Sequence, residues 1–318
     1  MVLTNGPECA NAREAAAMYG NLKDRVFLVT GASSGIGFET ALSLVRAGGT
    51  VIMACREGNK SHQARDRILL EANESTVILI DLDLGSEESV KKCVDAFLAL
   101  ELPLDALVNN AGINGVEKWG PGIETQFAVN FLGHFYLTFL LHQKLLDTPG
   151  SRVVCISSES HCRVQETNFD LNKELPPKEE NYDSLHGYAF SNLARIWWVR
   201  VLSQKVPYPV VSLHPGVVAG TGMLQHMSLW SKIKQLWLIA MWEGKSALAG
   251  QNVGQVAKTQ TWAAVAPSEI IACLSGLYLN GNAGYSLGVP MQVSELAGNN
   301  KYAEAAFAFA ERYFKCKY

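Results

Sequence analysis

Thr30-Gly31-Ala32-Ser33-Ser34-Gly35-Ile36-Gly37 is the stretch that decides the fold of this chain. An apolar run at residues 25–29 precedes it and predicts a buried strand, and the pattern at residues 38–46 predicts a helix. A strand, a glycine-rich turn and a helix in this order are typical of a cradle for a dinucleotide. The glycine spacing is Gly-x-x-x-Gly-x-Gly rather than Gly-x-Gly-x-x-Gly, so the turn needs support from the rest of the sequence.

Small residues give this turn its predicted chemistry. Gly31 permits a tight turn, Gly35 lets the backbone approach a pyrophosphate, and Gly37 lets the helix pack closely on the strand. The N–H groups at the start of the helix attract the anion. We therefore expect the turn to bind the cofactor through Gly31, Ser33, Ser34, Gly35, Ile36 and Gly37.

Predicted strands and helices alternate along the chain. Strands are expected at residues 50–55, 76–81, 104–108, 152–156 and 209–213, and helices at 62–73, after Ser86, and at 125–146, 188–202 and 302–314. This alternation favours an α/β fold, a doubly wound Rossmann domain with a parallel sheet flanked by helices. No break in composition divides the chain. One domain is expected at residues 22–294, between an N-terminal extension at 1–21 and a C-terminal helix at 295–318.

Composition narrows the class of protein. Of the 318 residues, 48% are hydrophobic and 18% are charged, which is enough apolar material for a sheet covered on both faces. The net charge of -3 gives no reason to expect nucleic acid or an anionic membrane as partner. The seven cysteines are odd in number and no pair has zinc-type spacing, so we expect reduced thiols and no metal site.

Targeting signals are not predicted. Residues 1–20 carry charged side chains and lack the apolar core of a signal peptide. The most apolar stretch, at residues 229–242, contains two lysines and is shorter than the ~20 residues of a spanning helix. We expect a cytoplasmic protein without a membrane span, although the sequence allows peripheral contact with a membrane.

Polar motifs follow several predicted strands. Asn109-Asn110-Ala111-Gly112, Ser157-Ser158 and His214-Pro215-Gly216 each close a strand, while Asn130 and Tyr188 lie in the helical regions between them. With the glycine-rich turn, these residues resemble the short-chain dehydrogenase/reductase family, in its retinol-dehydrogenase-like and WW-domain-containing-oxidoreductase-like branch. The resemblance runs from about residue 22 to residue 266.

The resemblance implies a reacting centre made of Asn130, Ser158, Tyr188 and Asn192. In the family, hydride transfer to a carbonyl leaves an oxyanion, which the tyrosine protonates while the serine holds the substrate oxygen. Ser157 is the alternative to Ser158, because alternation along a strand points only one of the pair into the site.

The resemblance also implies contacts along the cofactor. The adenine would lie against Asp83 and Leu84, and the adenosine ribose against Asn110, Ala111 and Gly112. The nicotinamide would be bordered by Pro215, Gly216, Val218 and Thr221, and its ribose would be held by Tyr188 and Asn192. Thr221 stands six positions after Pro215, whereas the family usually has a threonine five positions after that proline.

The end of the second strand selects the cofactor. An acid there accepts the ribose 2′-hydroxyl of NAD, whereas an arginine accommodates the 2′-phosphate of NADP. This strand ends in Cys55-Arg56, so NADP(H) is favoured over NAD(H), with Ser33 and Ser34 as further donors to the phosphate. In the alternative, Arg56 is a solvated surface charge and Glu57 serves a ribose hydroxyl.

Asn192 departs from the family pattern, which has a lysine four residues after the tyrosine. Such a lysine lowers the pKa of the tyrosine through its charge and also hydrogen-bonds the nicotinamide ribose. An asparagine can still bind the ribose but carries no charge. We therefore expect Tyr188 to be a weaker base, which harms alcohol oxidation more than carbonyl reduction.

Arg195 offers a compensating charge. It lies seven residues after Tyr188, which returns it to within about 20° of the same helical face and roughly 10 Å along the axis. The interpretation favoured by the sequence alone is different: an arginine bound to a neighbouring acid or to solvent.

The remaining segments bear on substrate and partners. Residues 223–244 are rich in apolar side chains and form either a helix that covers the core or a lid that makes the substrate pocket lipophilic. Residues 159–187 are expected to be an irregular insertion. The family often pairs subunits through the helix at 188–202, so a homodimer is allowed, whereas Trp197 and Trp198 also fit a core position.

Two functions are therefore weighed. The first is an NADP(H)-dependent reductase of a lipophilic ketone or aldehyde, such as a steroid, retinoid or polyketide. The second is an NADP(H)-binding protein with weak or no redox activity, acting as a redox-neutral catalyst or a binding module, because Asn192 replaces the lysine.

Overall fold

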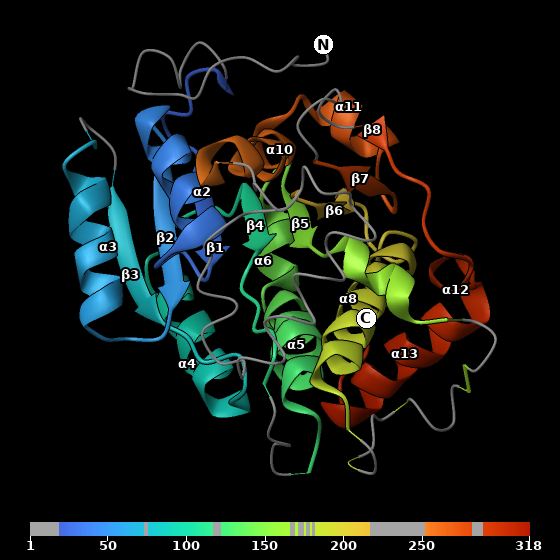
Figure 1. The fold of residues 1–318 in the computed structure, drawn as a ribbon. Coiled ribbons are helices and arrows are strands. Elements are labelled where there is room, and N and C mark those ends of the chain that lie inside the picture. Colours follow the sequence, from blue (N-terminus) through green and yellow to red (C-terminus); the bar gives the residue numbers. More distant parts are fainter. Residues whose placement is uncertain are drawn as a thin grey trace.

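The fold is a single eight-stranded sheet with helices on both faces, as a computed structural model shows (Figure 1). The structure describes residues 19–72, 76–116, 122–165, 169–170, 175, 179, 182–216, 252–281 and 289–318. The strand order is β3-β2-β1-β4-β5-β6-β7-β8, and every pair is parallel except β7 with β8. The predicted doubly wound α/β fold is confirmed.

The strands lie close to their predicted positions. They are β1 (Val26–Thr30), β2 (Thr50–Cys55), β3 (Val77–Asp81), β4 (Ala106–Asn109), β5 (Arg152–Ile156), β6 (Val210–His214), β7 (Tyr278–Asn280) and β8 (Val289–Pro290). After β3 the chain crosses back over β1 to form β4, so the order reverses between β1 and β4. A reversal of this kind opens a ligand crevice at the carboxyl ends of the strands.

Helices fill the connections between strands. They are α2 (Gly35–Arg46), α3 (Asn59–Leu69), α4 (Glu87–Leu98), α5 (Gly133–Leu140), α6 (His142–Asp147), α8 (Ser184–Leu202), α10 (Val253–Val265), α11 (Ser268–Cys273), α12 (Glu295–Gly298) and α13 (Asn300–Tyr313). Ser86 caps α4 by accepting a hydrogen bond from the Ser89 N–H, as its position before two acidic residues predicts. A 3₁₀ turn, η2 (Glu159–Arg163), follows β5.

The predicted helix at residues 125–146 is interrupted. Its first part is a π-helical segment, η1 (Phe127–Leu132), and the helix breaks at Leu141 between α5 and α6. Within η1, the Asn130 carbonyl accepts hydrogen bonds from the side chains of His134 and Arg195. Apolar spacing does not reveal this interruption, because the spacing resembles that of an unbroken helix.

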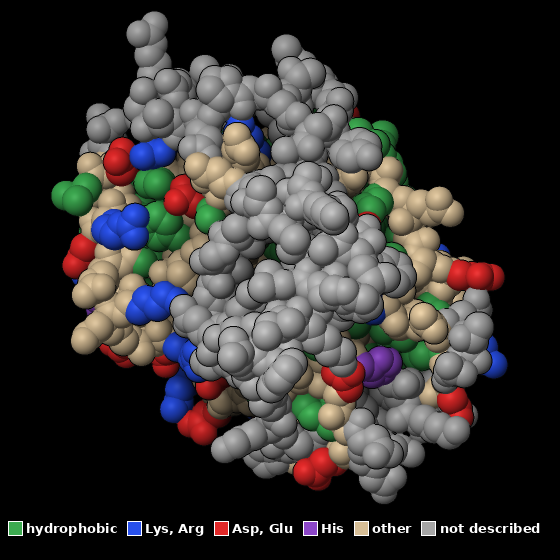
Figure 2. All heavy atoms as spheres, in the orientation of Figure 1, with side chains coloured by type: hydrophobic (Ala, Val, Ile, Leu, Met, Phe, Trp, Pro, Cys, Tyr) green, Lys and Arg blue, Asp and Glu red, His purple; other side chains and the backbone are tan. Residues whose placement is uncertain are grey.

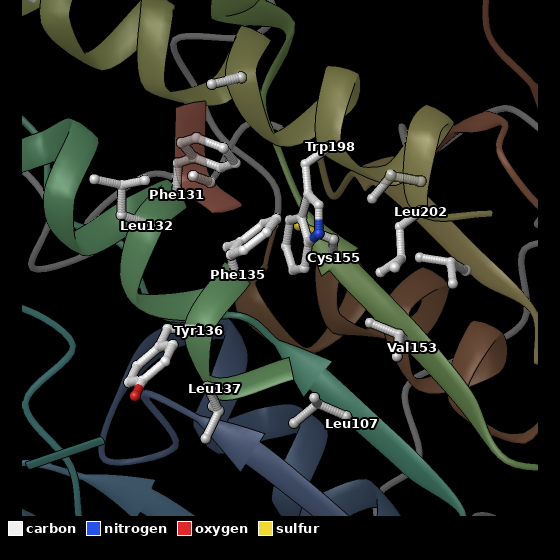
Figure 3. Packing of buried hydrophobic residues seen from close by; sticks show 14 of the residues in the cluster. Leu107, Phe131, Leu132, Phe135, Tyr136, Leu137, Val153, Cys155, Trp198 and Leu202 are labelled. Carbon is white, nitrogen blue, oxygen red and sulfur yellow. The ribbon is translucent and has the colours of Figure 1, made fainter. Parts of the chain in front are cut away.

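Alternate residues of each strand feed two hydrophobic cores, one on each face of the sheet. On β1, Leu28 packs toward α4, α5 and α8, whereas Phe27 packs toward α2 and α10. Figure 3 shows the first core, where Phe135 of α5 and Trp198 of α8 lie together above β5. Strands buried on both faces are what a parallel sheet requires, since water reaches neither side.

Helix α13 covers the outer side of α8. The indole N–H of Trp197 donates to the Leu296 carbonyl, and the Trp197 ring contacts Tyr302. Trp197 and Trp198 are fully buried. The chain's own C-terminal helix therefore occupies this side of α8, and the two tryptophans belong to the core.

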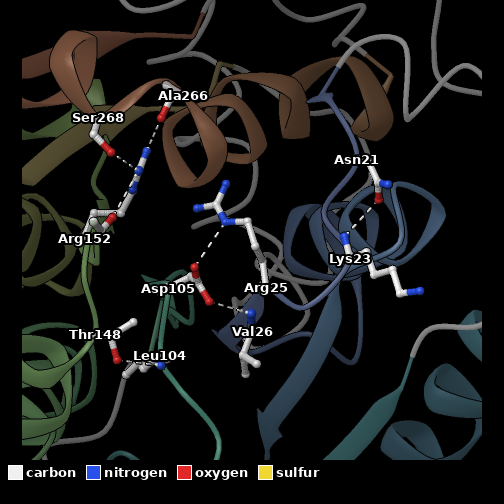
Figure 4. A network of polar contacts seen from close by, with 11 residues as sticks. Asn21, Lys23, Arg25, Val26, Leu104, Asp105, Thr148, Arg152, Ala266 and Ser268 are labelled. Carbon is white, nitrogen blue, oxygen red and sulfur yellow. Dashed lines mark hydrogen bonds and ion pairs between the residues drawn. The ribbon is translucent and has the colours of Figure 1, made fainter.

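The amino ends of the central strands are tied by a polar network that Figure 4 shows. Asp105 accepts from the Arg25 guanidinium and from the Val26 N–H. Arg152, buried at the start of β5, donates to the carbonyls of Gly150 and Ala266. This edge lies opposite the carboxyl ends, where the predicted site residues gather.

The surface of the described residues carries both signs of charge. Figure 2 shows basic and acidic side chains intermixed on the α3 and α4 side of the face drawn, and Lys91 and Lys92 pair with Glu87 and Glu88. Over the described ranges, no helix is long and apolar enough to cross a membrane. The same ranges contain no cluster of three or more metal-binding side chains.

Candidate functional site

Thr30, the last residue of β1, joins the glycine-rich turn to the end of β4. Its hydroxyl accepts from the N–H groups of Asn110 and Ala111, both at 2.9 Å. The Asn110 side chain in turn donates to the Thr30 carbonyl at 2.8 Å and lies against Gln260 of α10. These bonds hold the ends of β1 and β4 in one fixed relation at the point where the strand order reverses.

The turn has no room for larger residues. A Cβ on Gly37 would stand 2.3 Å from Asn110 Nδ2 and 2.7 Å from the Gly31 carbonyl oxygen. A Cβ on Gly31 would lie 2.9 Å from the Ala111 Cα, and Gly31 has a φ of +69°. The absent side chains let the turn, α2 and the loop after β4 pack this closely, as the cradle of a dinucleotide requires.

The start of α2 is suited to an anion. Ser34 is the N-cap residue, is exposed and makes no side-chain capping bond, and the first turn contains no acidic residue. The N–H groups of the first helical turn therefore lack an internal negative partner. Ser33 and Ser34 lie beside them, as the predicted phosphate site requires.

The end of β2 presents Arg56 as its exposed charge. The Cys55 thiol turns inward against Ala32 and Ser33, and burial raises its pKa to about 11. Glu57 directs its carboxylate toward His62, 3.6 Å away, and its N–H donates to Asp81. Arg56 is thus an exposed cation at this edge of the predicted cofactor site.

The predicted adenine contacts follow β3. Asp83 is exposed, and its Oδ1 accepts from the Gly85 N–H at 2.9 Å. The Leu84 side chain is buried in the core beneath, where a Cβ on Gly133 would stand 2.3 Å from the Leu84 carbonyl oxygen. Asp83 therefore offers a carboxylate to a ligand, whereas the Leu84 side chain lies in the core and its carbonyl packs against Gly133.

Of the two serines at the end of β5, Ser158 faces Tyr188. The Ser157 hydroxyl is buried and donates to the Asn192 carbonyl at 3.0 Å. The Ser158 hydroxyl accepts from the Ser160 N–H and hydrogen-bonds the Tyr188 phenol. This geometry favours Ser158 over Ser157 for the predicted role of holding a substrate oxygen.

Tyr188 lies in the first turns of α8 and is a protonated phenol at neutral pH. Burial raises its pKa above the ordinary value, and the charge of Arg195 and the hydrogen bonds from Ser158 and Asn192 oppose that rise only in part. The Asn192 amide also donates to the Tyr188 carbonyl at 2.9 Å. Asn192 therefore stands beside the phenol as a neutral donor.

Asn130 is enclosed. Its side chain exchanges two hydrogen bonds with the backbone of Ile113 and donates to the Ser191 hydroxyl. Its carbonyl accepts from His134 and Arg195. Asn130 joins the loop after β4 to α8, so the catalytic role implied by the resemblance would be exerted through this framework.

The sequence-based interpretation of Arg195 as an arginine bound to a neighbouring acid or to solvent is wrong. Its side chain is buried and donates to three carbonyls, those of Ala111, Asn130 and Ile156. The guanidinium lies directly beneath Gly112, where an added Cβ would stand 3.7 Å from one of its nitrogens. Partners on three segments distant in sequence make this position unpredictable from α8 alone.

Glu159 and His214 are further ionisable groups that the sequence did not single out for the site. Glu159 directly follows Ser158 at the carboxyl end of β5, and His214 directly precedes Pro215 at the carboxyl end of β6. His214 Nε2 lies 3.7 Å from Glu159 Oε2, and burial lowers the pKa of His214 to about 4. Burial raises the pKa of Glu159. Their adjacency to motif residues is the signal in the sequence that could have found them.

The predicted nicotinamide border is described in part. Pro215 and Gly216 are buried just after β6, and Gly216 has a φ of +109°. Val218, Thr221 and the apolar segment at 223–244 lie outside the described residues. Pro215 and Gly216 stand at the same sheet edge as Ser158, because neighbouring parallel strands end together.

The fold and these residues define a class: a doubly wound dinucleotide-binding protein whose serine and tyrosine meet at the carboxyl ends of the strands. The family model for short chain dehydrogenase matches residues 25–167. Human retinol dehydrogenase 12 is 34% identical over 288 residues, covering 89% of this chain and 84% of its own length. The chain belongs to the short-chain dehydrogenase/reductase family of oxidoreductases.

Other similar proteins agree with this assignment. The WW domain-containing oxidoreductase of Danio rerio is 35% identical over 271 residues, covering 82% of this chain. That alignment spans 62% of the zebrafish protein, so the chain matches about three fifths of its length. A crystal structure of an uncharacterised Mycobacterium paratuberculosis protein has a TM-score of 0.68 and 27% identity, covering 95% of this chain and 97% of its own.

Proposed function

We propose that this chain is an NADP(H)-dependent reductase of a lipophilic ketone or aldehyde, such as a steroid, retinoid or polyketide, with Tyr188 as general acid. The observation that carries the proposal is the contact between Ser158 and a Tyr188 phenol that burial keeps protonated. Carbonyl reduction needs a proton donor at this position, whereas alcohol oxidation needs the phenolate.

The proposed reaction divides the work among three residues. The nicotinamide cofactor, when bound, supplies the hydride that attacks the carbonyl carbon. Ser158 and Tyr188 hold the carbonyl oxygen, and the Tyr188 O–H bond breaks as its proton passes to that oxygen. The phenolate left on Tyr188 is then protonated from solvent. The Asn192 amide donates to the Tyr188 carbonyl and favours the phenolate by lowering the pKa of Tyr188.

NADP(H) is proposed over NAD(H) because of the charge at the end of β2. Cys55 stands where an acid would accept the ribose 2′-hydroxyl, and its buried thiol offers no negative charge. Arg56 is exposed at the end of β2, Ser33 lies against the preceding Cys55, and the side chains of Arg56, Ser33 and Ser34 suit a 2′-phosphate. Solved structures of the same fold include NADP complexes, which is a property of those proteins.

The substrate class and setting rest on the sequence. The apolar segment at 223–244 supports a lipophilic pocket, and the odd number and scattered positions of the cysteines support a cytoplasmic location. Because α13 covers the outer side of α8, we propose that any homodimer forms through another surface. The mixed charge of the surface gives no support for nucleic acid as a partner.

The second candidate function is an NADP(H)-binding protein with little redox activity. The observation that favours it is Asn192, a neutral side chain where the family has a lysine. In that case the cofactor site would serve a binding role or a redox-neutral reaction in which Tyr188 acts only as an acid.

One experiment separates the two candidates. Purified protein is incubated with NADPH and a panel of steroid, retinal, polyketide and aromatic carbonyls, and NADPH oxidation is followed by absorbance. Turnover of any carbonyl, lost in Tyr188→Phe, supports the reductase. Tight NADPH binding by calorimetry without turnover supports the second candidate, and absence of binding contradicts both.

A further inference from the structure

Arg195 is a buried cation without a carboxylate. Its three guanidinium nitrogens donate to the carbonyls of Asn130, Ile156 and Ala111. Within the described ranges, no aspartate or glutamate pairs with it. Burying a charge costs several kcal/mol unless other groups stabilise it, and neutral carbonyls do so only in part. The residue therefore holds a charge that nothing in its immediate contacts neutralises.

His134, the nearest titratable neighbour, does not share that charge. Its Nδ1 lies 2.9 Å from the Asn130 carbonyl oxygen and 3.2 Å from a guanidinium nitrogen of Arg195, and its Nε2 lies 2.9 Å from the Thr30 hydroxyl. Burial and the Arg195 charge lower the pKa of His134 well below its ordinary value. The imidazole is neutral, so Arg195 is the cation of this cluster.

Arg195 interacts electrostatically with two groups that can become anions, Cys155 and Tyr188. Cys155 lies in β5, is fully enclosed, and has a pKa that burial raises to about 11. Tyr188 contacts Ser158 at the end of the sheet. Of the two, only Tyr188 has a role in which forming the anion is part of the proposed reaction.

Arg152 shows what a purely structural buried arginine looks like in this fold. It too donates to carbonyls, those of Gly150 and Ala266, at the opposite edge of the sheet (Figure 4). Arg152 has the carboxylate of Asp105 within electrostatic reach, and that charge favours its charged form. Arg195 has no such acid among the described residues; in its place stands the Tyr188 phenol.

We propose that Arg195 is a positioning residue that supplies, from beneath Gly112, the fixed positive charge that a lysine at position 192 would otherwise direct at Tyr188. The proposal rests on the proposed role of Tyr188 as the proton donor. Three carbonyls from three segments fix the guanidinium in place, so its charge acts through space without contact with the substrate.

The division of labour follows from the contacts around the phenol. Ser158 and Asn192 supply hydrogen bonds, while Arg195 and Arg163 supply charge. Arg195 acts more strongly than Arg163, and both favour the phenolate that proton transfer leaves behind. Asn192 thus keeps the hydrogen bond of the missing lysine, and Arg195 keeps its charge.

A titration of Tyr188 tests this without turnover. The protein is labelled with fluorotyrosine, and the ¹⁹F resonance of position 188 is assigned by its loss in Tyr188→Phe. Arg195→Gln should raise the midpoint of that resonance by about one pH unit, since one charge at this range shifts a pKa by roughly that amount. In Arg195→Lys, the titration midpoint of Tyr188 should stay nearer the wild-type value. Arg200→Gln, which removes a charge farther along α8, is the matched control and should shift nothing.

Arg195→Gln leaves carbonyls without donors and can fail to fold, so the wild type provides a second measurement. The Nε–H resonance of Arg195 should follow the ionisation of Tyr188, because coupling between two sites is reciprocal. That pH-dependent shift should vanish in Tyr188→Phe. The proposal is overturned if the Arg195 resonance does not change as Tyr188 ionises. It is also overturned if Arg195→Gln folds and Tyr188 in it titrates with the wild-type midpoint.

These outcomes are independent of the proposed function. A protein that oxidises no NADPH with any carbonyl, yet shows coupled titration, retains the Arg195 inference and loses the reductase assignment. A protein that turns over carbonyls without coupled titration retains the reductase and loses the role of Arg195. If the protein is active, Asn192→Lys should raise turnover more when it is added to Arg195→Gln than when it is added to the wild type. In the first case the lysine replaces the charge that Arg195→Gln removed.

Discussion

The two sides of the crevice meet the family pattern in different ways. On the β1 side, Gly31 and Gly37 stand against Asn110, and neither glycine can be enlarged. On the α8 side, the expected lysine is replaced by Asn192, and a buried arginine stands at position 195 of the same helix. The first side depends on contacts at the limit of packing, whereas the second depends on charge.

The difference has a physical cause. Repulsion between atoms rises steeply over a few tenths of an ångström, so a glycine that touches backbone has no substitute. A charge acts over many ångströms in a buried setting and can be supplied from another residue. A cofactor cradle is therefore recognisable residue by residue, while the electrostatics of a reacting centre are a sum to which different positions can contribute.

Removing the proton donor is expected to have the largest effect. Tyr188→Phe should lower the rate of carbonyl reduction by about 10²- to 10⁴-fold, the usual contribution of general acid catalysis, and change NADPH binding little. Rates and calorimetry measure the two quantities. Ser157→Ala is the matched control, because its hydroxyl donates to the Asn192 carbonyl and is directed away from Tyr188. Equal losses of reduction rate in Tyr188→Phe and Ser157→Ala would contradict the assignment of Ser157 to the side that faces away from Tyr188.

A larger residue in the glycine-rich turn should impair the β1 side of the crevice and leave the α8 side unchanged. Gly37→Ala places a methyl group 2.3 Å from Asn110 Nδ2, so we expect NADPH affinity to fall by about a hundredfold. The free energy of unfolding should fall by about 1 to 3 kcal/mol, as in other overpacked sites. Calorimetry and thermal denaturation give both values. Gly298→Ala, where nothing lies within 4 Å, should change neither.

Cofactor choice should depend on one exposed charge. Arg56→Ala should weaken NADPH binding by about thirtyfold, the equivalent of about 2 kcal/mol for a charge-assisted contact with phosphate, and leave NADH binding unchanged. Arg65→Ala serves as control, because Arg65 pairs with the adjacent Asp66. A similar loss for NADH and NADPH would place Arg56 outside the 2′-phosphate site.

The pH dependence should differ between the two directions of reaction. Burial raises the pKa of Tyr188 above its ordinary value, so the proton needed for reduction is present through neutral pH and is lost only as pH rises through that raised value. Oxidation needs the phenolate, and its rate should rise about tenfold per pH unit below the pKa. A reductive rate that already declines between about pH 7 and 8 would show that another group titrates.

Sequence patterns predicted the framework well and the reacting centre less completely. Thr50–Cys55 and Arg152–Ile156 were placed to the residue, because apolar runs in a sheet buried on both faces are continuous. The break at Leu141 was missed, because its spacing resembles an unbroken helix. Arg195 was misjudged, since its acceptors come from η1, from the end of β5 and from the loop after β4, and only the folded chain brings them together.

The packing of α13 on α8 has a consequence for how the chain folds while it is being synthesised. The indole of Trp197 donates to the Leu296 carbonyl, 99 positions later, and the aromatic rings of α13 complete the core around α8. Domains acquire their structure as the ribosome releases them, from the N-terminus onward. The helix that carries Tyr188 emerges well before its cover. Until the C-terminal helices are released, the nascent chain lacks the cover of Trp197, whereas Trp198 already packs on Phe131 and Phe135.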